Sequence, residues 1–397
     1  MSGLGSLYQY VGIVLSVLLL LWIPSINAWT SYSHQVVARH DLRETSASCL
    51  QDFVDQLGSV RHCEIGSTKY GRGLVATKDL EPGETILRIP LSATIQIDAS
   101  QNGDDMKLDD SWAAALANKL MERLQSGSCP YVDSLPPPPP TPARGDWSTQ
   151  ALEALEDSDF LQEIEQAIRW RNRQCERYVM GRLCLDEDSS SATQKNPQLF
   201  MEALDLVSSR TIRCGDKFML VPFLDMANHA SQDQGGGYYQ LEYSPSLQDV
   251  TIALKAGNRG VQAGNEVFLD YGDRRNEEWL IYYGFLPDRN TAECVTLPES
   301  QQRITWSNVH MLDDLYRAEC RVLLNKGDTT LTDDIRSLKH IEALEERDSH
   351  FELALKYRIS RKSLLSAAGG TKSSSALFSS FFEEGGQNVA GSSTEQE

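Results

Sequence analysis

The stretch LVPFLDMANH, residues 220–229, passes from an apolar run into three polar side chains within five positions. Such a change predicts the end of a buried strand, followed by groups that donate and accept hydrogen bonds. Taken singly, Asp225 and Asn228 are typical of residues that cap a turn, and His229 of a histidine satisfied by backbone groups. Together, at the end of one apolar run, they indicate a site.

A second stretch, GNEVFLDYG at residues 264–272, is followed by Asn276 and by the segment YYGF at 282–285. The pattern predicts a strand, a turn and a helix around residues 276–283, with several phenol groups on or near that helix. Packing in the core is the ordinary role of a tyrosine taken singly, with its hydroxyl bonded to some backbone group.

A third stretch, TKYGRGLVATKD at residues 68–79, contains Gly71 and Gly73. Two glycines separated by one residue let a backbone turn approach a ligand closely, although a turn between two strands is the more common meaning of the pattern. The stretch does not lead from a strand into a helix, so it is not a dinucleotide-binding fingerprint.

These three stretches, in the order in which they follow along the chain (68–79, 220–229 and 264–285), resemble the SET domain, in the branch that contains the Rubisco large-subunit lysine methyltransferases and the actin-histidine methyltransferases. The resemblance runs from about residue 58 to 367, and the D-x-x-N-H and Y-G-F motifs are its most specific parts. Cys129 stands where this family often has Trp, Arg72 stands where it often has an apolar residue, and the tail is shorter than usual. Further matching segments are GRGLVATKDLEPGE (71–84), SCPYVDSLP (128–136), SSR (208–210), NEEWLIYYGF (276–285), TTLTDDIRSL (329–338) and ALKYRISRKSLL (354–365).

The resemblance implies an α+β fold, in which a SET-domain β-sheet core with pseudoknot-like C-terminal motifs contains a helical insert and precedes a small helical domain. We expect the SET domain at 58–290 with its insert at about 105–208, a short helical substrate-binding region at 291–367, and a disordered tail at 368–397. Apolar periodicity predicts strands within 63–90 and 211–269, and helices at 110–124, 151–178, 198–208, 309–324 and 333–367.

The resemblance also implies that the protein transfers a methyl group from S-adenosylmethionine to the side-chain amine of a lysine in a non-histone protein. Tyr271 would be the catalytic tyrosine, and Tyr283 and Phe285 would bind the substrate side chain. No metal is implied. The residues expected to bind or support the cofactor are Gly71, Arg72, Gly73, Arg210, Asp225, Met226, Asn228, His229 and Tyr271.

Composition restricts the partners. The 397 residues carry a formal net charge of −19, which repels nucleic acid and favours basic proteins as partners. The 8 cysteines form no C-x-x-C pair, so neither a zinc site nor a disulfide scaffold is expected. We expect a monomer.

The N-terminus contains a targeting signal. Residues 11–23 are almost wholly apolar, Pro24 ends the run, and small residues lead to Ala28, a pattern that predicts a signal peptide at 1–28. The run is shorter than the roughly 20 residues that span a membrane, and contact with a membrane is expected only if 11–28 stay uncleaved. Residues 29–57 read as a transit or linker segment, which favours delivery through the secretory route to a plastid. The alternative is an anchor in the ER membrane.

The same residues leave three other functions open. A methyl-histidine product is the close alternative, because the same branch contains both activities. A SET fold that binds a partner without catalysis is a second alternative, against which Tyr271 and His229 argue. A hydrolase based on Asp225 and His229 is disfavoured, because no G-x-S-x-G motif accompanies them.

Overall fold

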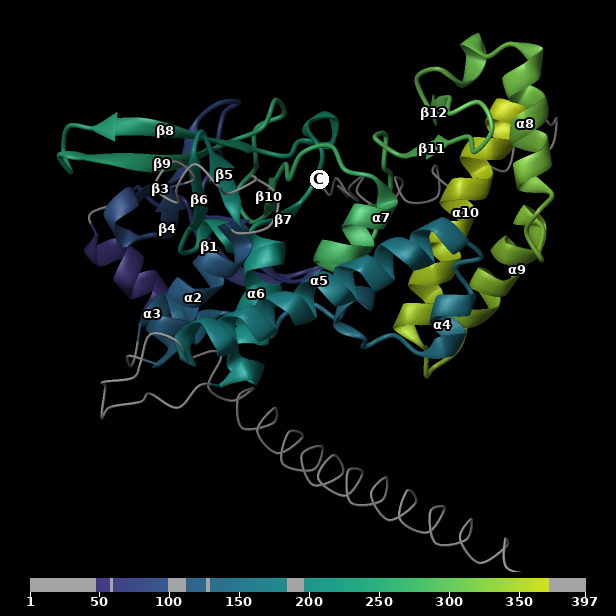
Figure 1. Cartoon of the computed structure of the whole chain (residues 1–397). Coiled ribbons are helices and arrows are strands. Elements are labelled where there is room, and N and C mark those ends of the chain that lie inside the picture. The colour runs from purple at the N-terminus through teal and green to yellow at the C-terminus, as the bar shows by residue number, and fades with distance from the viewer. Residues whose placement is uncertain (1–47, 58–59, 99–111, 126–128, 184–195, 371–397) are drawn as a thin grey trace, which may run out of the picture.

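The computed structural model describes residues 48–57, 60–98, 112–125, 129–183 and 196–370. Strands β1 to β10 gather on one side of the molecule, and the last three helices, α8, α9 and α10, lie on the other together with the short pair β11 and β12 (Figure 1). The long helix α5 (Ser158–Leu183) and the short helix α7 (Asn276–Glu278) lie between these two parts. The predicted signal peptide lies outside the described residues, as do residues 29–47 and 371–397.

One sheet brings the three stretches of sequence together. Its strand order is β1-β2-β10-β7, with β1 at Cys63–Thr68, β2 at Gly71–Ala76, β10 at Glu266–Leu269 and β7 at Asn228–His229. β1 and β2 form an antiparallel hairpin, whereas β10 pairs antiparallel with β2 and parallel with β7. The register Phe268↔Asn228 and Leu269↔His229 therefore fixes the D-x-x-N-H motif beside the strand that leads to Tyr271.

Two three-stranded sheets complete the core. β9 (Asp249–Lys255) lies between β3 (Thr85–Pro90) and β8 (Tyr238–Ser244), and β6 (Lys217–Leu220) lies between β4 (Ile95–Asp98) and β5 (Ile212–Cys214). Buried side chains alternate along β4 and occupy the four consecutive positions 251–254 of β9, which is the middle strand of its sheet. The predicted strand regions are therefore confirmed.

A helical segment interrupts the strands between β4 and β5. It contains α2 (Trp112–Gln125), α3 (Pro130–Ser134), α4 (Thr149–Glu153), α5 and α6 (Pro197–Arg210). The Asn196 side chain accepts a hydrogen bond from the Leu199 N–H, and Pro197 occupies the first turn, so the start of α6 is set by its sequence. Trp112 of α2 stacks on Phe218 of β6 with ring centroids 4.5 Å apart, which fixes the helices against the sheet.

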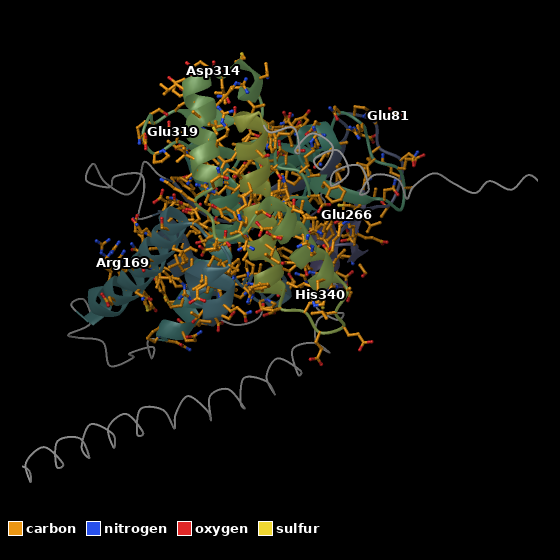
Figure 2. All side chains as sticks on the ribbon, turned by 90° about the vertical axis from the view of Figure 1, so that its right-hand side faces the viewer. Glu81, Arg169, Glu266, Asp314, Glu319 and His340 are labelled. Atoms are coloured by element: carbon orange, nitrogen blue, oxygen red, sulfur yellow. The ribbon has the colours of Figure 1, made fainter. Side chains whose placement is uncertain are left out.

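The C-terminal part is built around α10 (Ser349–Gly369), which packs against α8 (Asp314–Leu324) and α9 (Leu331–Glu342). Asp313, Thr330 and Asp348 cap the three helices through their side chains. Figure 2 views this part from the side, with Asp314 and Glu319 of α8 at one end and His340 of α9 toward the other. The sequence pattern did not predict the antiparallel pair β11 (Cys294–Thr296) and β12 (Arg303–Thr305), nor the break between α9 and α10.

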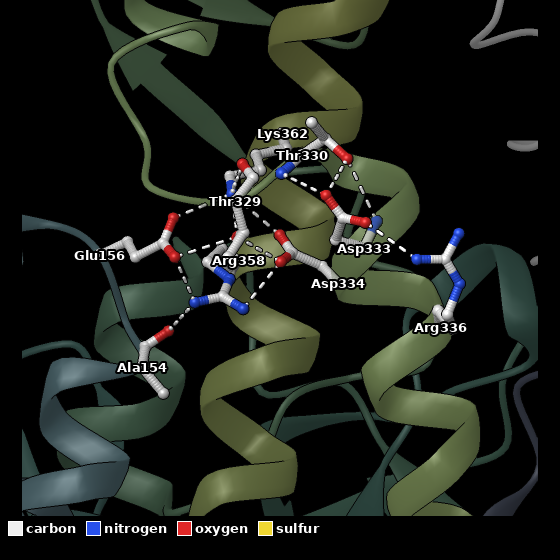
Figure 3. A network of polar contacts seen from close by, with 9 residues as sticks. All are labelled: Ala154, Glu156, Thr329, Thr330, Asp333, Asp334, Arg336, Arg358 and Lys362. Carbon is white, nitrogen blue, oxygen red and sulfur yellow. Dashed lines mark hydrogen bonds and ion pairs between the residues drawn. The ribbon is translucent and has the colours of Figure 1, made fainter.

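A buried polar network connects α10 to α9 and to the turn that precedes α5 (Figure 3). Arg358 of α10 lies 2.7 Å from Glu156 Oε1 and 2.7 Å from Asp334 Oδ1. Lys362, one turn further on, lies 2.9 Å from a carboxylate oxygen of each of the same two acids. Two buried cations and two buried carboxylates therefore neutralise one another where the C-terminal helices contact the rest of the chain.

No helix among the described residues has both the length and the apolar composition required to cross a membrane. The same residues contain no cluster of three or more His, Cys, Asp or Glu side chains arranged to hold a metal ion.

Candidate active site

Asn228 lies at the centre of the contact between β7, β10 and the β1–β2 hairpin. Its Nδ2 donates to Glu266 Oε1 at 2.7 Å and approaches the Arg72 carbonyl oxygen at 3.3 Å. Gly73 permits this approach, because a Cβ there would lie 2.8 Å from Nδ2 and 2.7 Å from Glu266 Oε1. Gly71 closes the hairpin with a φ of +95°, a conformation that only glycine adopts without strain.

Asp225 and Arg210 form a buried pair beneath this contact. The Asp225 side chain has no exposed surface, its Oδ2 accepts from the Tyr131 hydroxyl at 2.8 Å, and Arg210 Nη1 lies 3.5 Å from the same oxygen. Arg210 Nη1 also donates to the Asp225 carbonyl oxygen at 2.7 Å. Burial raises the pKa of Asp225, and the charge of Arg210 opposes that rise.

Met226 and Phe223 fix the short 3₁₀ turn that contains Asp225. Arg72 Nη2 lies 3.0 Å from the Met226 sulfur, which joins the glycine hairpin to this turn. Phe223 has a φ of +71° and is fully buried, so packing holds a non-glycine residue in a conformation that it seldom adopts. The backbone between 223 and 228 is therefore held in one shape.

His229 is a neutral imidazole whose ring position is fixed by the backbone. Its Nδ1 lies 3.2 Å from the Tyr271 nitrogen and 3.3 Å from the Leu269 carbonyl oxygen. Because the Tyr271 N–H requires an acceptor, we assign Nδ1 as that acceptor and place the ring proton on Nε2. Burial lowers the pKa of His229 below its ordinary value, which keeps the ring uncharged at neutral pH.

Tyr271 follows β10 directly and points its hydroxyl back at the 223–228 turn. The hydroxyl donates to the Ala227 carbonyl oxygen at 2.7 Å. Burial raises the pKa of Tyr271 far above its ordinary value, so the phenol keeps its proton at neutral pH. Tyr271 can therefore donate a hydrogen bond or offer its ring face, but it does not act as an ionised base.

Aromatic rings surround Tyr271. Its ring centroid lies 5.4 Å from that of Tyr283 and 5.2 Å from that of His229, and Phe285 lies 6.2 Å from Tyr283. The faces of such rings attract cations, and their bulk excludes water. We call the five rings His229, Tyr271, Trp279, Tyr283 and Phe285 the aromatic cluster.

Trp279 is a member of this cluster that the sequence analysis missed. Its ring lies 4.6 Å from His229, 5.0 Å from Tyr283 and 5.2 Å from Phe285, so it contacts more members of the cluster than Phe285 does. The spacing could have revealed it, because Trp279 and Tyr283 are four residues apart on a helix and thus share a face.

Two neighbouring motif residues lie elsewhere. Tyr282 has 44% of its surface exposed, and Asn276 is buried, with its Nδ2 donating to Ser360 of α10 at 2.9 Å. Asn276 therefore joins α7 to α10 and is not part of the site. The structure brings all the other residues that the sequence singled out into one region around β7, β10 and the β1–β2 hairpin.

The arrangement is suited to binding and orienting uncharged and cationic groups. It offers neutral phenols, a neutral imidazole, backbone carbonyls and ring faces, and its one ionic pair is buried. Such a site can hold two reactants in line and exclude water.

No family model matches the chain. It is 24% identical over 257 residues to the chloroplastic Rubisco large-subunit N-methyltransferase of Nicotiana tabacum, covering 58% of this chain and 49% of that protein. It is 24% identical over 282 residues to the actin-histidine N-methyltransferase of Rattus norvegicus, covering 66% of this chain and 44% of that protein. Protein SET DOMAIN GROUP 40 of Arabidopsis thaliana is 25% identical over 285 residues, with 62% of this chain and 56% of that protein covered. The chain thus spans about half the length of the curated relatives that it matches.

The structure resembles solved SET domains. The SET domain of LSMT bound to lysine and AdoHcy superposes with a TM-score of 0.61 at 17% identity, covering 84% of this chain and 92% of that one. Rubisco LSMT bound to AdoMet superposes with a TM-score of 0.58 at 17% identity, covering 85% and 92%. These likenesses confirm the predicted SET-domain fold and the resemblance to this branch.

Proposed function

We propose that this chain, which has the SET-domain fold and resembles the Rubisco large-subunit and actin-histidine branch, transfers a methyl group from S-adenosylmethionine to a lysine of a non-histone protein. The observation that carries the proposal is the position of Tyr271, whose neutral phenol lies between the Ala227 carbonyl oxygen and an aromatic cluster. Relatives with both named activities and a neighbour solved with lysine and AdoHcy support it.

The residues around Asn228 fit the cofactor. Gly73 leaves room for a close approach that a Cβ would fill, and the buried Asp225 Oδ1 has no hydrogen-bond partner among the described residues. Bound S-adenosylmethionine would supply an electrophilic methyl group on a positively charged sulfur. Asn228 and His229 would hold its amino-acid and adenine parts, Gly71, Arg72 and Gly73 would pack against it, and Arg210, Asp225 and Met226 would fix the shape of the pocket.

Tyr271, Tyr283 and Phe285 would receive the accepting side chain. A lysine has a reference pKa of about 10.4 and must lose a proton before its nitrogen can accept a methyl group. Burial among aromatic rings disfavours the ammonium form of the lysine. After transfer the methylated nitrogen is positively charged, and the ring faces attract that charge. Positioning and exclusion of water would supply most of the rate.

Histidine is the second candidate acceptor, since the actin-histidine relatives are as similar to this chain as the lysine-directed one. A neutral imidazole does not have to lose a proton before it accepts a methyl group, so the aromatic cluster also suits it. Total hydrolysis of labelled product followed by amino-acid analysis separates methyl-lysine from methyl-histidine.

The helices α8, α9 and α10 would dock the protein substrate, with α10 joining them to α7 and hence to the aromatic cluster. The Asn276–Ser360 hydrogen bond and the packing of Tyr357 on Phe160, at 4.9 Å between ring centroids, support this role for α10. We propose a single chain as the active unit and no direct contact with nucleic acid.

Calorimetric titration of the purified chain with S-adenosylmethionine tests the proposal. We expect saturable heat at one site per chain and transfer of a labelled methyl group to proteins of a cell extract. A folded chain that gives no heat and no transfer would leave only the partner-binding function for this fold.

We also propose that the first 28 residues direct the protein into the secretory route and onward to a plastid. A relative whose printed name is chloroplastic supports the destination. Residues 1–28 fused to a fluorescent protein should enter the secretory route, and residues 1–57 should reach the plastid. Fluorescence that remains diffuse in the cytosol with both fusions would contradict this proposal, and a stable signal in the ER membrane would support the anchor instead.

A further inference from the structure

Arg274 lies in the turn between β10 and α7, next to the aromatic cluster, and none of the sequence motifs assigns it a role. The centre of its guanidinium lies 5.3 Å from the centroid of the Tyr283 ring. Tyr283 in turn lies 5.4 Å from Tyr271. A permanent positive charge is therefore placed one ring away from the proposed catalytic tyrosine.

The charge of Arg274 is not neutralised by a carboxylate in the part of the chain that the structure describes. The neighbouring Arg275 differs in this respect, because it lies 3.2 Å from a carboxylate oxygen of Glu163 and 3.9 Å from one of Glu277. The Nε atom of Arg274 is buried and, within the described residues, has no hydrogen-bond partner. Across the described ranges, the Arg274 guanidinium has no acid in an ion pair beside it, and it lies over the Tyr283 ring. Its positive charge therefore acts on that ring and on the groups next to it.

The titratable groups of the cluster respond to this field. Burial raises the pKa of Tyr283, and the Arg274 charge is the largest effect that opposes the rise. Burial lowers the pKa of His229, and Arg274 lowers it further, against Asp270 and the Leu269 carbonyl. The other charged or titratable groups facing this region are Glu163 of α5, Arg210 of α6, Asp225, Tyr239 of β8, Glu266 of β10, Asp270 directly after β10, and Arg275, Glu278 and Tyr282 around α7.

We propose that Arg274 keeps the accepting lysine in its neutral form, by placing an unpaired positive charge behind the ring that lines its channel. This inference rests on the proposed function. The ammonium group would lose its proton to water, and the freed lone pair would form the N–C bond while the C–S pair stays on sulfur. The methylated nitrogen would carry the positive charge that the sulfur gives up with its methyl group, until it released a second proton.

The expected size of the effect follows from Coulomb's law. Two unit charges about 10 Å apart at an effective dielectric constant of about 20 repel by an amount that corresponds to a pKa change of about one unit. Arg274 acts through its field and touches no reacting atom, so it is a positioning residue for charge. Replacing the guanidinium should therefore shift the pH dependence of the rate, and it should change the maximal rate at high pH much less.

The test uses the full chain, labelled S-adenosylmethionine and a dialysed soluble-protein extract as acceptor. At low acceptor concentration the initial rate follows kcat/KM. This rate should rise with pH as the accepting lysine loses its proton, and we call this rising part of the pH–rate profile the acid limb. Arg274→Gln should move that limb by about one pH unit toward alkaline pH, lower the rate near pH 7 about tenfold, and approach the wild-type rate at high pH. Arg274→Lys should restore the limb, and the exposed Arg289→Gln should leave it in place.

The outcomes distinguish the role of Arg274 from the proposed methyl transfer itself. A rate that falls equally at every pH in folded Arg274→Gln would overturn the inference and leave Arg274 as a packing residue. Arg274→Met, which keeps the apolar stem over the Tyr283 ring, serves if the glutamine variant does not fold. Binding of S-adenosylmethionine by calorimetry should be unchanged in these variants. Absence of binding and transfer in the wild-type chain would overturn the proposed function itself, and this inference with it.

Discussion

Asn228 and His229 are adjacent in the chain but are held by different kinds of partner. Asn228 bonds to the side chain of Glu266 and approaches the Arg72 carbonyl oxygen, whereas His229 is fixed by the backbone that leads into Tyr271. At the scale of single residues, strand pairing therefore sets the hydrogen-bond partners of Asn228 and His229. Small changes in the space around them should affect ligand binding before they affect folding.

Gly73→Ala is a test at this scale. The new Cβ would lie within 2.8 Å of Asn228 Nδ2, Glu266 Oε1 and Thr68 Cγ2, so these side chains must move. We expect the affinity for S-adenosylmethionine to fall about tenfold or more, equivalent to at least about 1.4 kcal/mol, as measured by calorimetry. Gly66→Ala in the same hairpin meets only the Val75 side chain and is the matched control. Equal affinity in the two variants would contradict the role given to Gly73.

Among the elements, the five-residue π-helix Trp279–Tyr283 decides the shape of the aromatic cluster. The Gly284 N–H bonds to the Trp279 carbonyl oxygen, five residues back, and Gly284 then reverses the chain with a φ of +70°. The wide turn places Trp279 and Tyr283 on one side, and the reversal returns Phe285 to the same rings.

The sequence predicted a helix over residues 276–283, and the helix is present. It did not predict the π turn, because apolar spacing cannot separate turns of 3.6 and of more residues over so short a segment. The β11–β12 pair was missed because each strand has three residues, too few for an alternation to be visible. The motifs around Asn228 and Tyr271 were predictable because their order along the chain is specific, although no single residue was.

Contacts between elements can be tested at Arg358, which joins α10 to α9 and to the turn before α5. Its guanidinium contacts Glu156 and Asp334, both largely buried (Figure 3). Arg358→Ala leaves these carboxylates partly unpaired and should lower the free energy of unfolding by about 3–5 kcal/mol in chemical denaturation. Arg336→Ala removes an exposed partner of Asp333 on α9 and should cost at most about 1 kcal/mol. Similar losses in both variants would contradict the importance of the network.

Considered as a whole, the molecule has two parts joined by buried charge on both sides of α10. Tyr357 Oη lies 2.7 Å from Asp157 Oδ2 and 2.9 Å from Glu277 Oε1, although one phenol proton can be donated to only one of them. Burial raises the pKa of Glu277, and the charges of Arg275 and Arg361 oppose that rise. Glu293, next to this group, accepts from the Asn276 N–H at 3.0 Å and is fully buried.

Stability should therefore depend on pH through Glu293. Burial, with the nearby Glu277 charge, raises the pKa of Glu293 to about 8. Between the unfolded value of about 4.3 and that value the folded state holds a proton that the unfolded chain releases, so stability falls as pH rises. The slope contributed by this group is at most about 1.4 kcal/mol per pH unit.

Glu293→Gln should flatten the decline of the unfolding free energy between pH 5 and pH 8, measured by denaturant titration at several pH values. The amide keeps the shape of the protonated carboxyl and carries no charge to bury. Glu64→Gln at an exposed position is the control and should keep the wild-type slope. A slope that is the same in the wild-type chain and in Glu293→Gln would show that another group controls the decline.

Methyl transfer with Tyr271→Phe tests whether this phenol is catalytic. The variant keeps the ring in the aromatic cluster and removes only the hydroxyl that bonds to the Ala227 carbonyl oxygen. With labelled S-adenosylmethionine and a plastid or whole-cell extract, mass spectrometry should find methylated lysine in at least one protein treated with the wild-type chain. Tyr271→Phe should bind the cofactor equally well and transfer on the order of 100-fold more slowly. Full activity in this variant, or no methylated protein with the wild-type chain, would contradict the account.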